Sequence, residues 1–250
     1  MTGLGSRSRY RAPVLSRLPV AVMAAEPVAA RSGDRPVLNS IGDDERSNVL
    51  KVAIRRRFPR GEVVFHEGDP GDALHIVTSG LFVARSSSTM GELIGVNVFG
   101  EGAVFGELAL LTDDAHRSAT VVALQGGTTL MITRPHFDDL RARNPRVDRF
   151  LLSVLAERNR ALSAQLVELL FTPVEQRVYR RLLDFSGAAA SGEPSDGWVR
   201  LSQTELAVLA GTTRSTANRV LRRAEQCGLV ELARGRMRVL DTPALSARAH

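Results

Sequence analysis

The chain has 250 residues, 44% of them hydrophobic, which is enough for one large domain or two small ones. No apolar run approaches the roughly 20 residues that cross a bilayer, and the single cysteine, Cys227, excludes an internal disulfide, a cysteine-rich zinc site and an all-cysteine iron–sulfur cluster within one chain. The net charge of +6 is concentrated at the ends, with about +4 on residues 1–35 and about +5 on residues 214–250 by formal count. The basic C-terminal segment predicts a polyanionic partner.

The first 38 residues are rich in Arg, Ala, Pro and Ser and show no sustained period. We therefore expect residues 1–38 to form a disordered basic extension. An export signal is the competing interpretation, but the apolar stretch "VAVMAAEPVAA" is short and follows Arg17 and Pro19. A short helix is expected over about residues 41–54.

Short apolar segments separated by glycines occupy the chain from Phe58 to Leu130. They are "EVVFHEG", "ALHIVTSGLFVARS", "LIGVNVFG", "SATVVAL" and "TTLMIT". Short strands at this spacing, divided by turn residues, predict a small antiparallel barrel or sandwich.

The stretch "FGELALLTDDAHRSATV", residues 105–121, places a glycine, a carboxylate, an arginine and a hydroxyl around one apolar turn. Gly106 allows the backbone to approach a ligand, and "ELALL" can form a helical turn whose N–H groups suit a phosphate. Arg117 adds charge-assisted hydrogen bonds and Ser118 a hydroxyl. Because Glu107 would repel a phosphate, we expect it to accept a bond from a sugar hydroxyl. The pattern fits a ribose phosphate, although a surface ion pair between Arg117 and a nearby aspartate is the commoner arrangement.

A long helix is expected to begin at Asn144-Pro145, with Asn as the cap and Pro at the first helical position. Its apolar residues recur at helical period for about 26 residues, or roughly 39 Å. The stripe is explained either by packing within the chain or by a parallel dimer, and we favour the dimer. Thr172-Pro-Val-Glu175 then fits a capping box that opens a new helix, and residues 186–197 form a loop.

The C-terminal segment has the signature of a helix-turn-helix. Ser202-Gln-Thr-Glu205 is a capping box, Gly211 lies in a tight turn, and Gly228 ends the second helix. The sequence after it alternates around Arg234-Gly235, which predicts a hairpin wing.

The second of these helices carries a small apolar face and a basic face. Arginine suits guanine O6 and N7, asparagine suits adenine N6 and N7, and the later arginines suit phosphates. The predicted DNA-binding residues are Thr213, Arg214, Ser215, Asn218, Arg219, Arg222 and Arg223.

The chain from about residue 41 to 245 resembles the bacterial cyclic AMP receptor protein/FNR (CRP/FNR) family of transcription regulators. The resemblance is carried by "PRGEVVFHEGDPGDALHIVTSG", by residues 105–121, by the long helix and by "TELAVLAGTTRSTANRVLRRAEQCGLV". It implies an α+β fold with an N-terminal cyclic nucleotide-binding β-barrel (a double-stranded β-helix or jelly roll), a long dimerisation helix and a C-terminal winged helix-turn-helix domain. The expected boundaries are 39–143, 144–171 and 172–250.

The resemblance also assigns ligand contacts. Glu107 would bind the ribose 2′-OH, Arg117 and Ser118 the cyclic phosphate, and the backbone around Phe105, Gly106 and Leu108 would line the pocket. The family's cyclic AMP receptors often place a Thr and then a Ser or Asn against the purine, one from each subunit, and here the aligned pair is Leu162-Ser163. Ser163 fits this pattern, whereas Leu162 can neither donate nor accept a hydrogen bond.

The recognition helix also departs from the family pattern Arg-Glu-Thr-Val, because it reads Arg214-Ser-Thr-Ala. Ser215 replaces a glutamate that reads cytosine, which leaves the operator sequence open. The five histidines show no metal-binding spacing, and we expect neither a metal nor a catalytic site.

These observations predict a cytoplasmic, homodimeric transcription regulator that is not an enzyme. Its partners would be double-stranded DNA with a near-palindromic operator, cyclic AMP as allosteric ligand and, by family resemblance, RNA polymerase, but no membrane. Ligand binding would shift a hinge near 171–174. One alternative is the same DNA-binding dimer without cyclic nucleotide dependence or with another effector. The other is a cyclic nucleotide-binding regulatory subunit of an enzyme.

Overall fold

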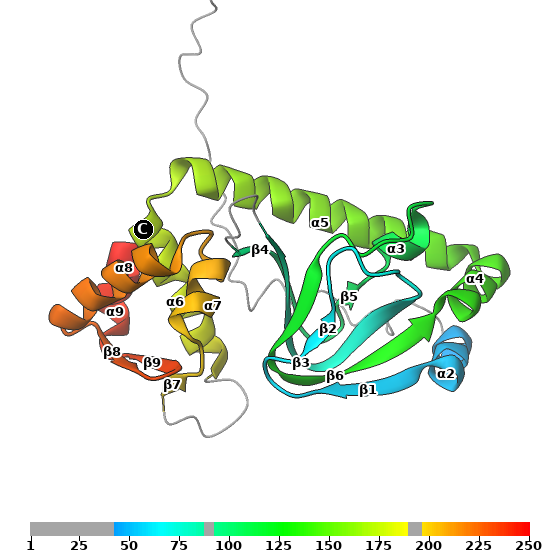
Figure 1. Ribbon diagram of the computed structural model, residues 1–250, viewed down its shortest axis with the longest axis horizontal. Helices are drawn as coiled ribbons and strands as arrows, with labels where there is room; N and C mark the ends of the chain where they lie inside the picture. Colours follow the sequence, from blue (N-terminus) through cyan, green and yellow to red (C-terminus); the bar gives the residue numbers. More distant parts are fainter. Residues whose placement is uncertain (1–42, 88–92, 190–196) are drawn as a thin grey trace, which may run out of the picture.

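The computed structural model describes residues 43–87, 93–189 and 197–250. A β-rich N-terminal part and a mainly helical C-terminal part lie side by side along one long helix, α5 (Figure 1). The predicted extension, residues 1–38, lies outside the described residues, and so does most of the predicted loop 186–197. No described helix is long and apolar enough to span a membrane.

The N-terminal part is an antiparallel sheet, as predicted. Its order is β1-β6-β3-β4, with β2 paired to β6 and β5 paired to β3. The strands are β1 (Ile54–Phe58), β2 (Val63–Phe65), β3 (Ala73–Ser87), β4 (Leu93–Phe99), β5 (Val104–Phe105) and β6 (Thr120–Thr133).

Two segments expected to be separate strands, "SATVVAL" and "TTLMIT", belong to one strand, β6. The Gly126-Gly127 pair between them does not end the strand, because it packs against the neighbouring β3. A Cβ atom on Gly127 would lie 2.4 Å from the carbonyl oxygen of Ser79, so glycine allows two backbones to meet where the sheet bends.

Three short helices flank this sheet: α2 (Asp43–Val52), α3 (Leu108–Leu111) and α4 (Arg134–Arg143). The sheet encloses an aromatic core in which Phe82 packs edge-on against Phe58, with ring centroids 5.9 Å apart, and also contacts Phe105. Phe82 and Phe105 are fully buried, so the strand that precedes the predicted ligand turn is fixed by the core.

The long helix α5 spans Pro145–Phe171, as its start signals predict. The Asn144 side chain accepts a hydrogen bond of 2.9 Å from the backbone N–H of Arg146. One face packs on the sheet and on α4, and another face leaves large apolar side chains in solvent. These are Leu152, Leu162, Leu166, Val167, Leu170 and Phe171, which are 40–79% exposed.

The C-terminal part contains the predicted winged helix-turn-helix. Its elements are α6 (Val174–Ala189), β7 (Trp198–Val199), α7 (Gln203–Leu209), α8 (Arg214–Gln226), β8 (Val230–Ala233), β9 (Arg236–Val239) and α9 (Thr242–Ala249). The capping box of Ser202 and Glu205 is confirmed, and Gly211 has the expected positive φ of 59°. Helix α6 begins one residue later than predicted and continues through residues 186–189, which were expected to be loop.

Two buried arginines of α6 join the end of α5 to the helix-turn-helix. Arg177 donates from Nη1 to the carbonyls of Leu169 and Thr172, at 3.1 and 3.0 Å. The same guanidinium donates from Nε to Ala210 at 3.0 Å and from Nη2 to Gly211 at 3.2 Å. One side chain therefore caps the end of α5 and holds the turn between α7 and α8.

One turn further along α6, Arg181 forms an ion pair with Glu168 of α5 and donates to the carbonyl of Leu209 at 3.3 Å. Glu168 and Arg181 are each only 6% exposed. The last turn of α5, the start of α6 and the end of α7 thus form one hydrogen-bonded block.

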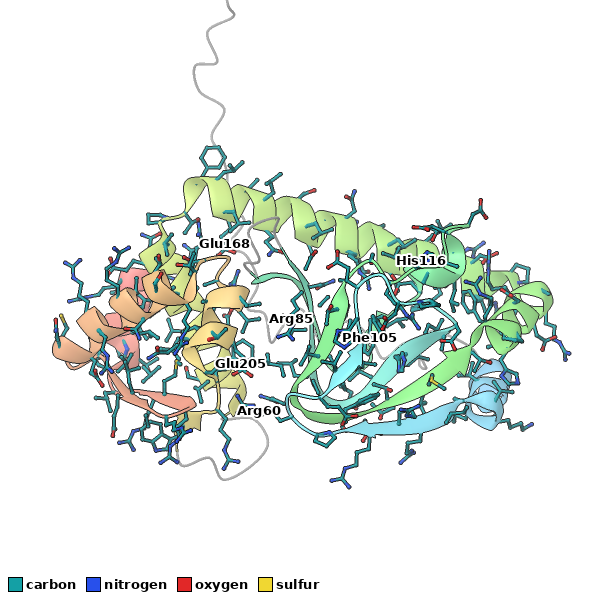
Figure 2. The ribbon with its side chains drawn as sticks, in the orientation of Figure 1. Arg60, Arg85, Phe105, His116, Glu168 and Glu205 are labelled. Carbon is teal, nitrogen blue, oxygen red and sulfur yellow. The ribbon has the colours of Figure 1, made fainter. Side chains whose placement is uncertain are left out.

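The sheet also touches the helix-turn-helix directly (Figure 2). Arg60, in the β1–β2 turn, forms a 2.7 Å ion pair with Glu205 of α7. On β4, a Cβ atom added to Gly95 would lie only 2.8 Å from the carbonyl oxygen of Val208, so the strand and α7 are in close contact. Gln165 of α5 donates to the Gly95 carbonyl at 3.1 Å.

Candidate functional site

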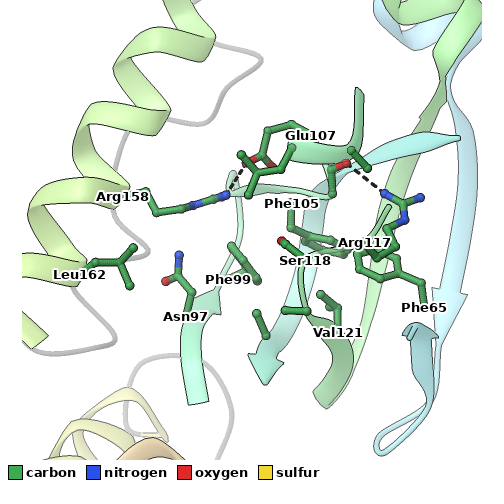
Figure 3. Close-up of a pocket in the computed structure, with 15 residues that line it drawn as sticks. Phe65, Asn97, Phe99, Phe105, Glu107, Arg117, Ser118, Val121, Arg158 and Leu162 are labelled. Carbon is green, nitrogen blue, oxygen red and sulfur yellow. Dashed lines mark hydrogen bonds and ion pairs between the residues drawn. The ribbon is translucent and has the colours of Figure 1, made fainter. Parts of the chain in front are cut away.

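A cavity of about 220 Å³ lies between the sheet and α5 (Figure 3). It brings together seven of the eight residues predicted to bind a ligand, which are Phe105, Gly106, Glu107, Leu108, Arg117, Ser118 and Leu162. The sequence prediction missed the other lining residues, which are Phe65, Ala84, Asn97, Phe99, Ala109, Ala119, Val121 and Arg158.

Arg117 lies at one end of the cavity and is held by backbone oxygens. Its Nη1 donates to the carbonyls of Ala73 and Gly106, at 2.7 and 3.0 Å, and the guanidinium lies 4.2 Å from the ring centroid of Phe65. The exposed Asp72 carboxylate is 3.5 Å away. Arg117 is therefore a buried cation held by backbone carbonyls, and not the surface ion pair with an aspartate of its own turn that was the alternative to a ligand site.

The environment of Arg117 requires glycine at position 106. Gly106 has φ of 81°, and a Cβ atom there would lie 2.7 Å from Arg117 Nη1. Burial lowers the pKa of Arg117, while the nearby acidic groups, first Asp72, oppose that shift. The guanidinium nevertheless stays charged, and its Nε is buried without a partner among the described residues. A ligand anion would compensate this charge.

Glu107 opens the four-residue helix α3 and is completely buried. Its Oε1 forms an ion pair with Arg158 of α5, whose Nη2 also donates to the Val104 carbonyl at 2.9 Å. The second oxygen, Oε2, has no partner among the described residues. Buried carboxylate oxygens are normally satisfied, so this orphan acceptor marks a place for a ligand donor such as a hydroxyl.

His75 of β3 lies behind the cavity wall. Its ring stacks on Phe105, with centroids 5.1 Å apart and planes at 7°, and its Nδ1 is 3.0 Å from Thr129 Oγ1. Burial, followed by the charges of Arg117 and Arg56, lowers the pKa of His75 to about 3. His75 is therefore a neutral packing residue at physiological pH.

The second helix of the helix-turn-helix, α8, presents an exposed basic surface at the far end of the molecule from α4 (Figure 1). Thr213 caps the helix by accepting from the backbone N–H of Thr216 at 3.2 Å. Arg214, Ser215, Arg219, Arg222 and Arg223 are all exposed. The buried side of α8 is Ala217, Leu221 and Ala224, as the sequence pattern predicts.

Comparison with protein families gives two matches in chain order. Residues 55–144 match a cyclic nucleotide-binding domain, and residues 176–248 match a Crp-like helix-turn-helix domain. The chain belongs to the CRP/FNR family of transcription regulators. Members of this family are DNA-binding regulators rather than enzymes.

Individual relatives cover most of the chain. The cyclic AMP receptor protein of Thermus thermophilus is 31% identical over 210 residues, which is 84% of this chain and 94% of that protein. A CRP-like cAMP-activated global transcriptional regulator of Mycobacterium tuberculosis is 32% identical over 196 residues, covering 77% and 86%. The c-di-GMP-responsive global regulator CLP of Xanthomonas campestris has a similar structure, with a TM-score of 0.70, 25% identity and coverage of 80% and 100%.

In this CRP/FNR family member, the two α5 residues that the resemblance aligned with purine contacts lie in different environments. Leu162 lines the cavity, whereas Ser163 lies outside it, exposed, with its hydroxyl donating to the Asn159 carbonyl at 3.0 Å. The two side chains point about 100° apart around the helix, because consecutive residues of an α-helix do so. Within one chain, therefore, only Leu162 reaches the cavity.

The structure adds two details of the helix-turn-helix domain that the sequence did not indicate. Asn218 is half-buried, and its amide donates to Gln203 of α7 at 2.6 Å. In the wing, Arg236 and Arg238 lie 4.4 and 5.0 Å from the Trp198 ring centroid. The strand that carries Trp198, β7, was not predicted, and it pairs with β9 of the wing.

Arg158 is the most informative of the missed pocket residues. It precedes Leu162 by four residues, so both lie on one face of α5, and this spacing was a readable signal. Asn97 is the other polar residue that was missed. It comes from β4, just before residues 105–121 in the sequence, and it reaches the cavity because β4 pairs with β3.

Proposed function

We propose that this CRP/FNR regulator is a cytoplasmic homodimer whose binding to double-stranded DNA is controlled by a cyclic nucleotide, with cyclic AMP as the first candidate. The observation that carries the proposal is that one cavity is lined by a buried carboxylate and a buried guanidinium, Glu107 and Arg117, each with a polar atom that has no partner among the described residues. A sugar hydroxyl would donate to the first, and a cyclic phosphate would accept from the second. Two relatives carry cyclic AMP in their names.

The size of the cavity favours a mononucleotide over a larger ligand. Its volume of about 220 Å³ lies below the range of about 300–1,000 Å³ that is usual for small-molecule sites. A cyclic dinucleotide, such as the c-di-GMP named for CLP, has two bases and two phosphates. This cavity has one buried arginine at its phosphate end, Arg117, which fits one phosphate.

The exposed stripe of α5 supports a parallel dimer. Residues at alternating spacings of four and three lie on one exposed face of α5. This spacing is the repeat found where two parallel helices pack together. The residues are Leu152, Ala156, Asn159, Ser163, Leu166 and Leu170. In such a dimer Ser163 would sit at the seam, next to the pocket of the partner.

Two recognition helices on one dimer would occupy successive major grooves about 34 Å apart, so the operator would be a near-palindrome. We propose that ligand binding shifts the spacing of these helices. The predicted hinge near 171–174 is bridged by Arg177, so the shift would have to move the end of α5 and the helix-turn-helix together. RNA polymerase is the partner that family resemblance adds.

Calorimetric titration with cyclic AMP tests the ligand. We expect saturable binding that is lost in Arg117→Ala, because the phosphate would lose its charged donor. Arg143→Ala, an exposed arginine of α4 outside the cavity, is the matched control and should bind as the wild type does. An Arg117→Ala protein that binds cyclic AMP normally would contradict the assignment of the phosphate end.

The dimer is tested by sedimentation. Leu166→Asp places a charge in the seam and should give a monomer, whereas Ala164→Asp, about 160° away around the helix, should leave a dimer. Equal effects of the two substitutions would argue against this seam.

Leu162 favours a second candidate function, a dimer that binds DNA without any cyclic nucleotide. A side chain with no donor or acceptor stands where the family's cyclic AMP receptors often have threonine. A gel shift with duplex DNA, with and without cyclic AMP and over a range of salt, separates the candidates. DNA affinity that falls steeply with salt but does not change with cyclic AMP would support the second candidate. No binding to duplex DNA at all would rule out both candidate functions.

A further inference from the structure

We propose that Asn97 recognises the base of the bound nucleotide, and that the pocket accepts 6-oxopurine cyclic nucleotides at least as tightly as cyclic AMP. This inference rests on the proposed function, because it takes the cavity to be a nucleotide site. It identifies the residue that selects the base, and it names the chemical class of base that this residue favours.

The position of the base follows from the two ends of the cavity. Arg117 and Ser118 lie at one end and suit the phosphate, and Glu107 lies between them and α5 (Figure 3). The base would then occupy the remaining end, next to α5. The side chains there are Asn97 from β4 and Leu162 and Arg158 from α5, of which Arg158 is already bonded to Glu107 and to the Val104 carbonyl.

The orientation of the Asn97 amide is fixed by the strand. Its Oδ1 accepts a hydrogen bond of 2.9 Å from the backbone N–H of Val98. Because a backbone N–H can only donate, the oxygen must face the strand, and the Nδ2 group must face away from it. Figure 3 shows Nδ2 directed toward the space between Leu162 and Arg158. Asn97 is half-buried, so a bond to this group would be shielded from water.

The chemistry of this end therefore favours acceptors on the base. Asn97 Nδ2 donates, and Leu162 offers neither a donor nor an acceptor. The major-groove edge of a 6-oxopurine such as guanine presents two acceptors, O6 and N7, whereas adenine presents the N7 acceptor and the N6 amino donor. An adenine amino group would meet only the Asn97 oxygen, which already accepts from Val98, whereas a 6-oxo group would meet the free Asn97 Nδ2 donor.

A comparison of cyclic AMP with cyclic IMP tests this inference, because hypoxanthine carries the 6-oxo group without the 2-amino group of guanine. We expect wild-type protein to bind cyclic IMP and cyclic GMP at least as tightly as cyclic AMP. In Asn97→Ala, affinity for cyclic IMP should fall by about five- to tenfold, and affinity for cyclic AMP by clearly less. Gln125→Ala, an exposed amide on β6, is the matched control and should change neither.

Asn97→Asp keeps the shape of the side chain but replaces the donor with an acceptor, so it should reverse the ratio in favour of cyclic AMP. The inference is overturned if wild type binds cyclic AMP more tightly than cyclic IMP, or if Asn97→Ala lowers both affinities equally or leaves both unchanged. Absence of binding by all three nucleotides would remove the proposed function, and this inference with it. Normal thermal unfolding of each variant shows that a lost affinity is not lost folding.

Discussion

Replacing Arg177 with alanine tests whether one side chain joins α5 to the helix-turn-helix. The guanidinium makes four hydrogen bonds to backbone carbonyls, those of Leu169, Thr172, Ala210 and Gly211. At about 1 kcal/mol net for each bond, the sum is about 4 kcal/mol. Burial of the charged group, which lowers the pKa of Arg177, offsets part of this sum. We therefore expect the free energy of unfolding of the C-terminal part to fall by about 2–3 kcal/mol.

The assay is urea denaturation followed by the fluorescence of Trp198, which is the only tryptophan of the sequence and lies in β7. Gln176→Ala, on the same helix, is the matched control. The Gln176 amide donates to the His250 carbonyl at 3.3 Å, away from the α5 junction, so we expect a loss of about 1 kcal/mol or less. A change in Arg177→Ala no larger than that in Gln176→Ala would show that the four bonds do not stabilise the junction.

Three further predictions concern single positions. The pKa of His75 is about 3 in the folded protein against 6.5 unfolded, so protons bind the unfolded state first and stability falls with pH below about 6.5. Between about pH 6 and about pH 4.5 this group should lower the free energy of unfolding by about 2 kcal/mol. Denaturation of His75→Phe over the same pH range should show a loss that is smaller by this amount. Leu162→Thr adds a hydroxyl that can accept from the adenine amino group, and because a 6-oxo group already has the Asn97 donor, titration should show the ratio of cyclic AMP to cyclic IMP affinity rise by about threefold or more. Gly211→Ala forces alanine into φ of 59° with its Cβ 2.4 Å from Leu169 Cδ2, and Trp198 fluorescence should report a loss of about 1–2 kcal/mol.

The sequence was sufficient to predict the elements that begin with local signals. Asn144-Pro145, the Ser202–Glu205 capping box and Gly211 each act within a few residues of the backbone, and each was confirmed. Strand β1 was missed because Arg55, Arg56 and Arg57 are all exposed on an edge strand, so no alternation of apolar and polar residues marks it.

The candidate pocket was predictable where its residues are close in sequence. Residues 105–121 carry the glycine, the carboxylate and the arginine of the cavity within one turn. Asn97 could not be assigned in the same way, because it reaches the cavity through the pairing of β4 with β3. Arg158 was marked only by its spacing from Leu162, and its contact with Glu107 depends on the packing of α5 on the sheet, which joins distant parts of the chain.

The contact at Gly95 brings three parts of the molecule to one backbone position. Gly95 lies on the same strand as Asn97, accepts a hydrogen bond from Gln165 of α5, and packs against Val208 of α7. A methyl group here would separate the strand from α7 without altering a side chain that meets ligand or DNA. One small substitution at Gly95 would therefore change how the helix-turn-helix sits on the sheet, while the residues of the cavity and of the recognition helix stay the same.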